Sequence, residues 1–305
     1  MIICGDALTE LRKLPDESVN CCVTSPSYWG LRDYGVAGQL GLEKTPEEYV
    51  ARMVEVFREV RRALRSDGTL WLNLGDSYAH SLRQSGPDHA GKLANGSKGQ
   101  IKQGFKPLPA GMKEKDLVGI PWRVAFALQA DGWWLRQDII WAKPNPMPES
   151  VRDRCTKSHE YIFMLTKSAR YWYDAEAVCE ASVTQWMIDQ DRRKQRVEAT
   201  GGAISGGTGE KISSGNTRNR RSVWSVATAP YAEAHFATFP PEIPELCIKA
   251  GCPKGGVVLD PFFGAGTTGL VAMRLGRDFI GIELNEKYCE MSKKRIYWEL
   301  MEANP

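Results

Sequence analysis

The sequence predicts an α/β fold in which a mostly parallel sheet carries helices on both faces. Apolar, strand-like runs alternate with segments whose apolar residues recur at helical spacing. A glycine-rich turn stands between a strand and a helix near the C-terminal end of the sequence. The 305 residues, 42% hydrophobic and 25% charged, have the composition of a globular protein that buries a large core. Such alternation is typical of a parallel sheet covered on both sides.

The expected elements follow one another along the chain. Strands are expected at 1–3, 19–24, 69–74, 135–141, 161–166, 256–260 and 279–284. Helices are expected at 46–65, 121–130, 267–275 and 285–301, the last of them capped by Asn285. The first of these helices repeats apolar residues at helical spacing, at Tyr49, Met53, Phe57, Val60 and Leu64.

Composition and spacing exclude several classes of protein. No apolar run reaches the roughly 18 residues of a membrane span, and the N-terminus lacks the apolar core of a secretory signal. The eight cysteines contain no C-x-x-C pair, and the four histidines have no metal-ligand spacing. We therefore expect a cytoplasmic protein with no membrane association, no metal and eight reduced thiols.

Two segments interrupt the strand–helix alternation and are strongly basic, although the net charge is only +3. Residues 80–115 carry seven Lys and Arg against two acids, and residues 192–221 carry eight against two. Solvated surface loops are one interpretation of such segments. The other is a pair of mobile basic arms that contact phosphate groups.

The glycine-rich turn has the pattern G-x-G-x-x-G, formed by Gly264, Gly266 and Gly269. Glycines allow a tight turn and the close approach of a ligand to the helix N-terminus. Glu283 ends the next strand, where an acid can accept hydrogen bonds from a ribose diol. The pattern favours a cofactor site over a plain strand-to-helix turn.

The position of this unit argues against a dinucleotide as the cofactor. A dinucleotide fold has several further strands after the unit, whereas only 22 residues follow Glu283. The remaining strands must come from residues 1–170, so the order of the elements is permuted. Asp260, just before the turn, would repel a pyrophosphate and suits a cofactor that bears a cation.

A second candidate site follows the strand at 19–24, in the segment Ser25-Pro26-Ser27-Tyr28-Trp29. Ligands of α/β proteins bind at such strand ends. The Ser25 hydroxyl and the Pro26 carbonyl could accept the two hydrogens of an exocyclic amine, with Tyr28 facing a planar base. A Ser/Pro turn with two aromatic rings in the core is the alternative.

Together these two segments resemble the motif pair of the S-adenosylmethionine-dependent DNA amino-methyltransferases. Thr24–Trp29 is similar to their [DNS]-P-P-[YFW] catalytic motif, and Asp260–Thr267 to their D-P-F-x-G-[SA]-G-T cofactor loop. The order of the motifs resembles the permuted β group, and Ser-Pro-x-Tyr-Trp resembles the cytosine-N4 type. Ser27 departs from the pattern, since the family usually has a second proline there.

The resemblance implies a Rossmann-like methyltransferase fold and a set of site residues. It implies catalytic roles for Ser25, Pro26 and Tyr28. It implies contacts with S-adenosylmethionine, which leaves as S-adenosylhomocysteine, from Asp6, Phe239, Pro240, Asp260, Pro261, Phe262, Gly264, Gly266, Thr267 and Glu283. The segment 236–240 resembles the part that closes over the methionine moiety, and the segment 141–154 resembles one beside the target base.

The implied organisation has three parts. Residues 1–173 would form the catalytic half with the basic loop 80–115, residues 174–230 the loop-rich target-recognition region, and residues 231–305 the cofactor-binding half. Double-stranded DNA is the expected partner, and the resemblance allows for a cognate restriction endonuclease and a homodimer. Candidate contacts to phosphates or guanines are Arg192, Arg193, Arg196, Arg218, Arg220 and Arg221.

The expected activity is methyl transfer to the N4 amine of a cytosine that is flipped out of duplex DNA. Methylation of adenine N6 by the same fold is the nearest alternative, since a serine can serve either amine. An NAD-dependent oxidoreductase and a non-catalytic DNA-binding module are more distant alternatives. The absence of a Pro-Cys dipeptide disfavours methylation at cytosine C5.

Overall fold

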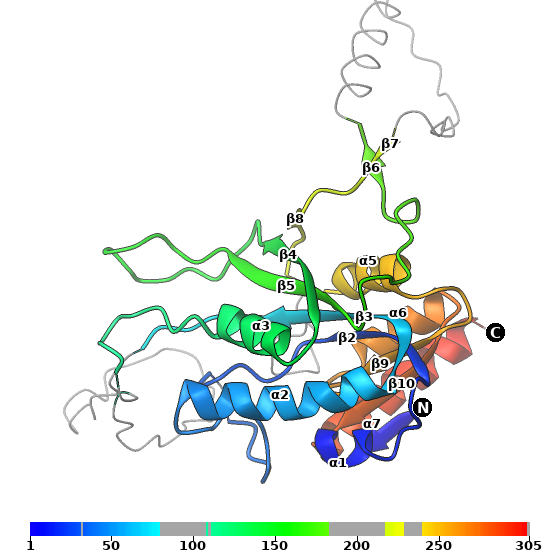
Figure 1. The fold of residues 1–305 in the computed structure, drawn as a ribbon, viewed down its shortest axis with the longest axis horizontal. Helices are drawn as coiled ribbons and strands as arrows, with labels where there is room; N and C mark the ends of the chain where they lie inside the picture. The colour runs from blue at the N-terminus through cyan, green and yellow to red at the C-terminus, as the bar shows by residue number, and fades with distance from the viewer. Residues whose placement is uncertain (32, 80–107, 109–110, 183–216, 229–239, 304–305) are drawn as a thin grey trace, which may run out of the picture.

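The computed structural model describes residues 1–31, 33–79, 108, 111–182, 217–228 and 240–303. Its centre is an eight-stranded sheet of order β1-β10-β9-β2-β3-β5-β4-β8 (Figure 1). The strands are β1 (Ile2–Cys4), β2 (Val19–Thr24), β3 (Leu64–Leu74), β4 (Trp134–Ala142), β5 (His159–Thr166), β8 (Val223–Ser225), β9 (Val257–Asp260) and β10 (Asp278–Glu283). Only β5 runs against the others in this sheet.

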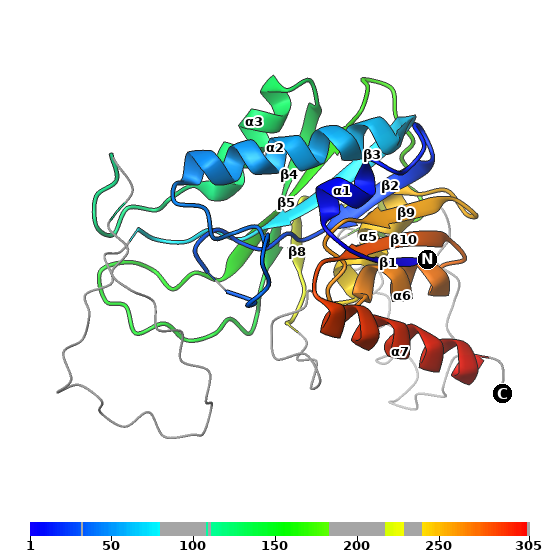
Figure 2. The same cartoon turned by 90° about the horizontal axis from the view of Figure 1, so that it is seen from below.

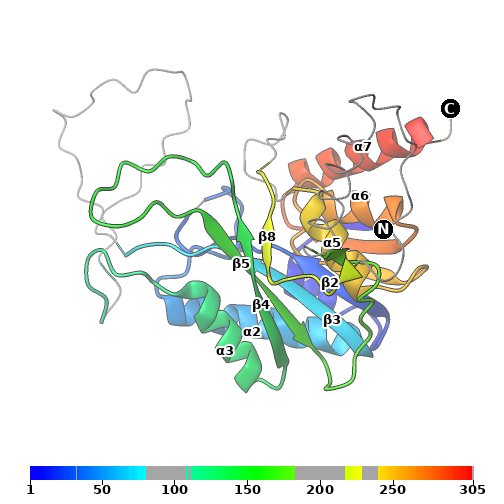
Figure 3. The same cartoon turned by 90° about the horizontal axis from the view of Figure 1, so that it is seen from above.

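Helices cover both faces of the sheet, which confirms the expected layers. One face carries α1 (Ala7–Leu11), α2 (Pro46–Ala63) and α3 (Ile120–Ala130), and the other carries α5 (Glu242–Gly251), α6 (Thr267–Arg274) and α7 (Glu286–Ala303). Figure 2 shows the sheet between these two groups, and Figure 3 shows α5, α6 and α7 on one side of the strands and α2 and α3 on the other.

The chain builds the sheet in a permuted order, as the sequence predicts. The first strand, β1, pairs in parallel with the last, β10, and β2 lies between β9 and β3. In the register, Cys4 lies opposite Glu283 and Gly281 lies opposite Asp260. The carboxyl ends of β1, β10, β9 and β2 therefore meet at one edge of the sheet, where ligands of α/β proteins bind.

The longest helix of the first face, α2, shows how local sequence sets an element. The Thr45 hydroxyl caps it by accepting from the Glu48 amide at 3.2 Å, and Pro46 occupies the first turn. Arg61 and Arg62 lie in its last turn, where cations suit the helix dipole. Its apolar stripe is buried as predicted, through Tyr49, Met53, Val56, Phe57, Val60 and Ala63.

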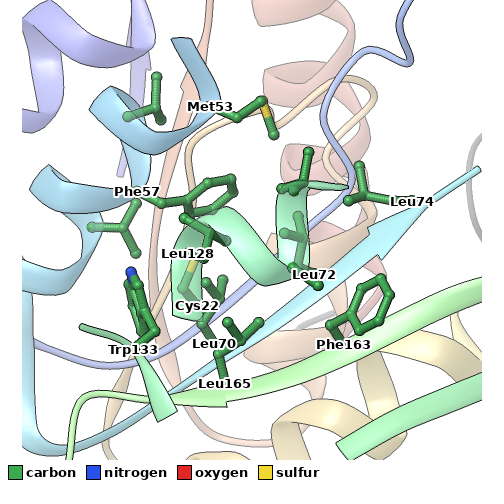
Figure 4. Close-up of a cluster of buried hydrophobic side chains, with 14 of the residues drawn as sticks. Cys22, Met53, Phe57, Leu70, Leu72, Leu74, Leu128, Trp133, Phe163 and Leu165 are labelled. Carbon is green, nitrogen blue, oxygen red and sulfur yellow. The ribbon is translucent and has the colours of Figure 1, made fainter. Parts of the chain in front are cut away.

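The sheet separates two hydrophobic cores, and neighbouring residues of one strand belong to different cores. Cys22 faces the core under α2 and α3, whereas Cys21 faces the core under α5 and α6. Figure 4 shows Leu70, Leu72 and Leu74 of β3 directed toward residues of α2 and α3. Both faces of β2 and of the second half of β3 are buried, and apolar residues predominate in these stretches.

Several small elements lie outside the expectation. Helix α1 and helix α5 fall in segments for which no element is expected, as does β8, which extends the sheet by pairing with β4. Strands β6 (Glu180–Ala181) and β7 (Thr217–Arg218) form a separate pair away from the main sheet (Figure 1). The division at 173/174 and 230/231 stays a prediction, although β8 places part of 174–230 in the main sheet.

The expectation of eight reduced thiols is wrong for two of them. Cys4 and Cys289 form a disulfide, with Cα atoms 6.1 Å apart and a separation of 285 positions in sequence. Strand β1 pairs with β10, and α7 packs back over both strands, so the two residues meet in space. The other six cysteines are free. Within the described ranges, no helix has the length and apolar character needed to cross a bilayer.

Candidate active site

A cavity of about 900 Å³ opens at the edge of the sheet where the carboxyl ends of the strands meet. It brings together nine of the residues that the sequence singles out: Asp6, Ser25, Pro26, Tyr28, Pro261, Phe262, Gly264, Thr267 and Glu283. Asp260, Gly266 and Pro240 are described but do not line it. Phe239, with the rest of 236–239, lies outside the described residues.

The glycine-rich turn is fixed by backbone geometry and by one carboxylate. Gly264 and Gly266 have φ angles of +51° and +80°, which favour glycine. The Gly264 amide donates to Glu283 Oε2 at 2.7 Å, and the Asn285 amide donates to Glu283 Oε1 at 2.8 Å. Burial raises the pKa of Glu283, while these backbone hydrogen bonds oppose the rise. The carboxylate thus holds the turn in place and still lines the cavity.

The third glycine of the pattern serves packing rather than the cavity. A Cβ atom at Gly269 would lie 2.5 Å from the Phe263 ring, and one at Gly281 would lie 2.4 Å from it. The Phe263 ring stacks on Phe279 with centroids 5.5 Å apart. These two glycines therefore make room for an aromatic ring under the turn, which matches the helix–strand packing role of a third glycine.

Asp260 connects the two candidate motifs from beneath the cavity. Its carboxylate accepts from the Thr24 hydroxyl at 2.6 Å and from the Thr268 hydroxyl at 2.7 Å. The Phe262 amide donates to the same group at 3.1 Å. Asp260 is only 2% exposed, and burial raises its pKa to about 6 against the lowering effect of these donors. Strand β2 is thereby tied to the turn that follows β9.

Two further predicted residues, Asp6 and Thr267, are held by hydrogen bonds at the end of the cavity that the glycine-rich turn lines. Asp6 caps α1, since its carboxylate accepts from the Thr9 amide at 2.9 Å and from the Thr9 hydroxyl at 2.7 Å. Arg295 of α7 donates to the Thr267 hydroxyl at 2.9 Å and to the Ala265 carbonyl at 3.2 Å. Both Asp6 and Thr267 line the cavity.

At the other end of the cavity, Ser25 and Tyr28 belong to a connected set of polar side chains. The Ser25 hydroxyl donates to Asn73 Oδ1 at 3.1 Å, and the Tyr28 hydroxyl donates to Glu160 Oε2 at 2.7 Å. Glu160 also forms an ion pair with Lys143, and both side chains are mostly buried. Burial and the nearby Glu160 charge raise the pKa of Tyr28, which therefore stays protonated.

The segment 141–154, expected beside the target base, does line this end of the cavity. Trp141, Lys143, Asn145, Pro146, Met147 and Glu149 contribute to the wall. Lys143 lies over the Trp141 ring, with its ammonium 4.3 Å from the centroid. Lys157 joins them and donates to the Asp76 carbonyl at 3.1 Å, and burial lowers its pKa. The described residues contain no group of three or more potential metal ligands.

A family of known proteins matches almost the whole chain. The family model N6_N4_Mtase, described as DNA methylase, matches residues 19–294. The chain belongs to this family of DNA methylases. It is similar to the type II methyltransferase M.SmaI of Serratia marcescens, with 48% identity over 97% of this chain and 90% of the relative. It is also similar to M.Cfr9I of Citrobacter freundii, with 48% identity over 97% of this chain and 87% of the relative.

Solved structures show the same fold as this methylase. The PvuII DNA methyltransferase (cytosine-N4-specific) has a TM-score of 0.64 at 19% identity, and the match covers 97% of this chain and 85% of that protein. A putative DNA modification methylase from Thermus thermophilus, complexed with S-adenosyl-L-methionine, has a TM-score of 0.59 at 24% identity. It covers 98% of this chain and 93% of its own. The expected fold class is confirmed, and family membership supersedes the oxidoreductase alternative.

The arginines expected to contact DNA are only partly described. Arg192, Arg193 and Arg196 lie outside the described residues. Around the β6–β7 pair, Arg218 and Arg221 both donate to Glu180 Oε1, at 3.0 and 2.6 Å. Arg220 donates to the Val178 carbonyl at 2.8 Å. The Nε groups of these three side chains are therefore used within the methylase, and their contacts with DNA stay a prediction.

Two residues that surround Ser25 and Tyr28 in the methylase stand in no motif and were not predicted from the sequence. Asn73 and Glu160 lie at neighbouring ends of β3 and β5, where Asn73 pairs with Ile162. Asn73 is a polar residue inside the apolar run of β3, and Glu160 stands just before the apolar run of β5. A buried polar residue at the end of a strand is the signal that could have found them.

Proposed function

We propose that this methylase transfers a methyl group from S-adenosylmethionine to the N4 amine of cytosine in double-stranded DNA. The observation that carries the proposal is the position of Ser25 and Pro26, which line the same cavity as the glycine-rich turn. Thr24, the residue before Ser25, is hydrogen-bonded to Asp260 at the start of that turn. An amine bound at Ser25 would therefore lie beside a cofactor bound at the turn.

The walls of the cavity fit S-adenosylmethionine at one end. Glu283 and Asp6 offer carboxylates for ribose and adenine contacts, and Gly264 allows the backbone to approach the cofactor closely. When bound, the cofactor supplies a methyl group on a sulfonium centre. The neighbour from Thermus thermophilus holds this molecule in a similar fold, which supports the assignment.

The chemistry expected of this chain is positioning of a weak nucleophile. The lone pair of an exocyclic amine is conjugated into the ring, which makes the nitrogen a poor nucleophile. Ser25 Oγ and the Pro26 carbonyl accept the two amine hydrogens, which favours a pyramidal nitrogen and directs its lone pair at the methyl group. Methyl transfer would form the N–C bond as the C–S bond of the cofactor breaks, with S-adenosylhomocysteine as the leaving group, and the nitrogen would then lose one proton to water. No covalent enzyme intermediate is involved.

Tyr28 supplies an aromatic wall for the flipped base. Its ring packs closely on Gly75, where a Cβ atom would lie 2.5 Å from it, and the side chain lines the cavity. Stacking of a base on an aromatic ring is worth about 1–3 kcal/mol, which offsets part of the cost of extracting the base. The Tyr28 hydroxyl is held by Glu160 and so fixes the plane of the ring.

One observation supports cytosine over adenine as the target base. The Ser-Pro-x-Tyr-Trp sequence of residues 25–29 resembles the motif of the cytosine-N4 type. The PvuII enzyme, which is named as cytosine-N4-specific, shares the fold, and so would an adenine-N6 enzyme of this kind. The type II names of the relatives support a role in modifying a site that a paired endonuclease cuts. The endonuclease and a homodimer stay predictions.

The test is to incubate the protein with labelled S-adenosylmethionine and unmethylated DNA of mixed sequence, and to identify the labelled nucleoside. We expect N4-methylcytosine, whereas N6-methyladenine would overturn the base assignment. Ser25→Ala should lower kcat by about 10²-fold or more, the usual effect of losing one transition-state hydrogen bond. Ser18→Ala, at the opposite end of β2, is the matched control and should keep full activity. Unchanged turnover in Ser25→Ala would overturn the role of Ser25.

A further inference from the structure

We propose that Asn73 is a positioning residue that turns the Ser25 hydroxyl so that its oxygen accepts a hydrogen from the target amine. The inference rests on the proposed function, in which Ser25 is an acceptor. A serine hydroxyl can donate or accept, and its rotor alone does not select between the two. The hydrogen bonds of Asn73 with its neighbours fix which way the Ser25 hydroxyl points its proton.

The first step is the orientation of the Asn73 amide. Its Nδ2 donates to the Tyr161 carbonyl at 3.1 Å and to Glu160 Oε2 at 3.2 Å. A carbonyl and a carboxylate can only accept, so the NH₂ group must face them. The Oδ1 atom consequently faces Ser25. Asn73 is only 3% exposed, so water does not compete for this arrangement.

The second step concerns the proton of Tyr28. The Tyr28 hydroxyl lies 2.7 Å from Glu160 Oε2, 3.1 Å from Asn73 Oδ1 and 3.4 Å from Ser25 Oγ. It has a single proton, and the shortest contact is the one with a carboxylate, which forms the stronger hydrogen bond. Tyr28 therefore gives its proton to Glu160 and does not donate to Ser25.

The third step follows for Ser25. With no donor among these neighbours, its oxygen is not occupied by a hydrogen bond from them, and its own proton goes to Asn73 Oδ1 at 3.1 Å. The Ser25 lone pairs are then available to a ligand in the cavity that Ser25 lines. Lys143 forms an ion pair with Glu160, and both side chains are mostly buried, so this pair anchors the arrangement.

The experiment is a double-mutant cycle with Asn73→Ala and Ser25→Ala, measured as kcat and as KM for S-adenosylmethionine. Asn73→Ala alone should lower kcat by about tenfold, the equivalent of one hydrogen bond, with KM and calorimetric cofactor affinity unchanged. In the Ser25→Ala background, Asn73→Ala should have no further effect on kcat, since it acts only through Ser25. Asn20→Ala is the control, because Asn20 also lies in the sheet but bonds the Val257 amide away from the cavity.

The outcomes separate this inference from the proposed function. An equal loss of kcat from Asn73→Ala in both backgrounds, or no loss in either, would overturn the inference and leave Ser25 as the acceptor. A Ser25→Ala protein with full turnover would overturn the role of Ser25 as an acceptor and the inference with it, whereas labelled N6-methyladenine would overturn the proposed base. Asn73→Leu, which keeps the branched shape of asparagine without an acceptor, tests the same step if the alanine variant does not fold.

Discussion

Asp260 illustrates at the scale of one residue how burial and hydrogen bonding compete. The side chain lies between the two motifs and accepts three hydrogen bonds, from Thr24, Thr268 and the Phe262 amide. These donors favour the charged form, yet burial is the larger effect and raises the pKa to about 6. The ionised carboxylate therefore carries a free-energy cost in the folded protein at neutral pH.

A pH-dependent stability follows from this shift. The folded pKa of about 6 lies above the ordinary value of 3.8, so between these limits the folded state binds the proton more tightly than the unfolded state. The stabilisation that this group contributes is fully present below about pH 4 and decreases as the pH rises to about 6. Above that pH it changes little. Relative to Asp260→Asn, the wild type should thus gain about 1–3 kcal/mol of unfolding free energy between pH 7 and 4.

Urea unfolding at several pH values measures this difference between the two proteins. Thr268→Val is the matched variant, since it removes a donor that lowers the pKa of Asp260. Its pH-dependent window should extend to higher pH than that of the wild type. A difference between wild type and Asp260→Asn that stays constant from pH 7 to 4 would contradict the prediction.

Single residues also show where sequence reasoning was sufficient for the candidate site and where it was not. Ser25, Tyr28 and Glu283 stand in recognisable patterns, and the structure brings them to one cavity. Asn73 and Glu160 stand in no such pattern, because their contact depends on the antiparallel pairing of β3 with β5. Strand β5 is antiparallel to the other strands of the sheet, and this direction brings the two side chains together. Local periodicity in the sequence does not reveal strand direction.

At the scale of one element, the start of α3 depends on a side chain from elsewhere in the chain. Gly119, its N-cap residue, offers no side chain, and Asp76 after β3 takes that role. The Gly119 and Ile120 amides donate to Asp76 Oδ1 at 3.0 and 3.1 Å. The carboxylate also suits the positive end of the helix dipole.

Asp76→Ala should therefore lower the unfolding free energy by about 1–2 kcal/mol, the usual effect of losing a helix cap. Asp131→Ala is the control at the other end of the same helix, where Asp131 pairs with the exposed Arg58. A surface pair is worth about 0–1 kcal/mol, and an acid at a helix C-terminus is unfavourable. Chemical denaturation of both variants measures how much unfolding free energy each one loses. Equal losses in the two variants would contradict a capping role for Asp76.

Long periodic elements were predictable from sequence, and short ones were not. Helix α2 has several full turns of apolar repeats, and its predicted and observed ranges almost coincide. Helix α1 has five residues and strand β8 has three, too few for a periodic pattern to appear. These short elements exist because tertiary contacts hold them, as when β8 pairs with β4.

At the scale of the whole molecule, the permuted order interleaves the two ends of the sequence. Strand β10 lies between β1 and β9, and β9 lies between β10 and β2. A fragment of residues 240–305 would therefore leave the strand edges of β9 and β10 unpaired and one face of these strands uncovered. We expect this fragment to show no cooperative unfolding on its own.

Co-expression with residues 1–228 should restore a folded complex, because this second fragment supplies β1 and β2. Near-ultraviolet circular dichroism and thermal unfolding of each fragment and of the pair measure the effect. A fragment 240–305 that unfolds cooperatively by itself would show that the strands of the glycine-rich turn do not need their partners.

The contact between Glu283 and the Gly264 amide also has a thermodynamic consequence for ligands. A glycine-rich turn has much conformational entropy to lose, and this loss must occur at some stage before a ligand is held. Here it occurs when the chain folds, since the carboxylate holds the turn in the free protein. A ligand that enters this end of the cavity meets a turn that is already ordered, so its affinity is not reduced by the ordering of the backbone.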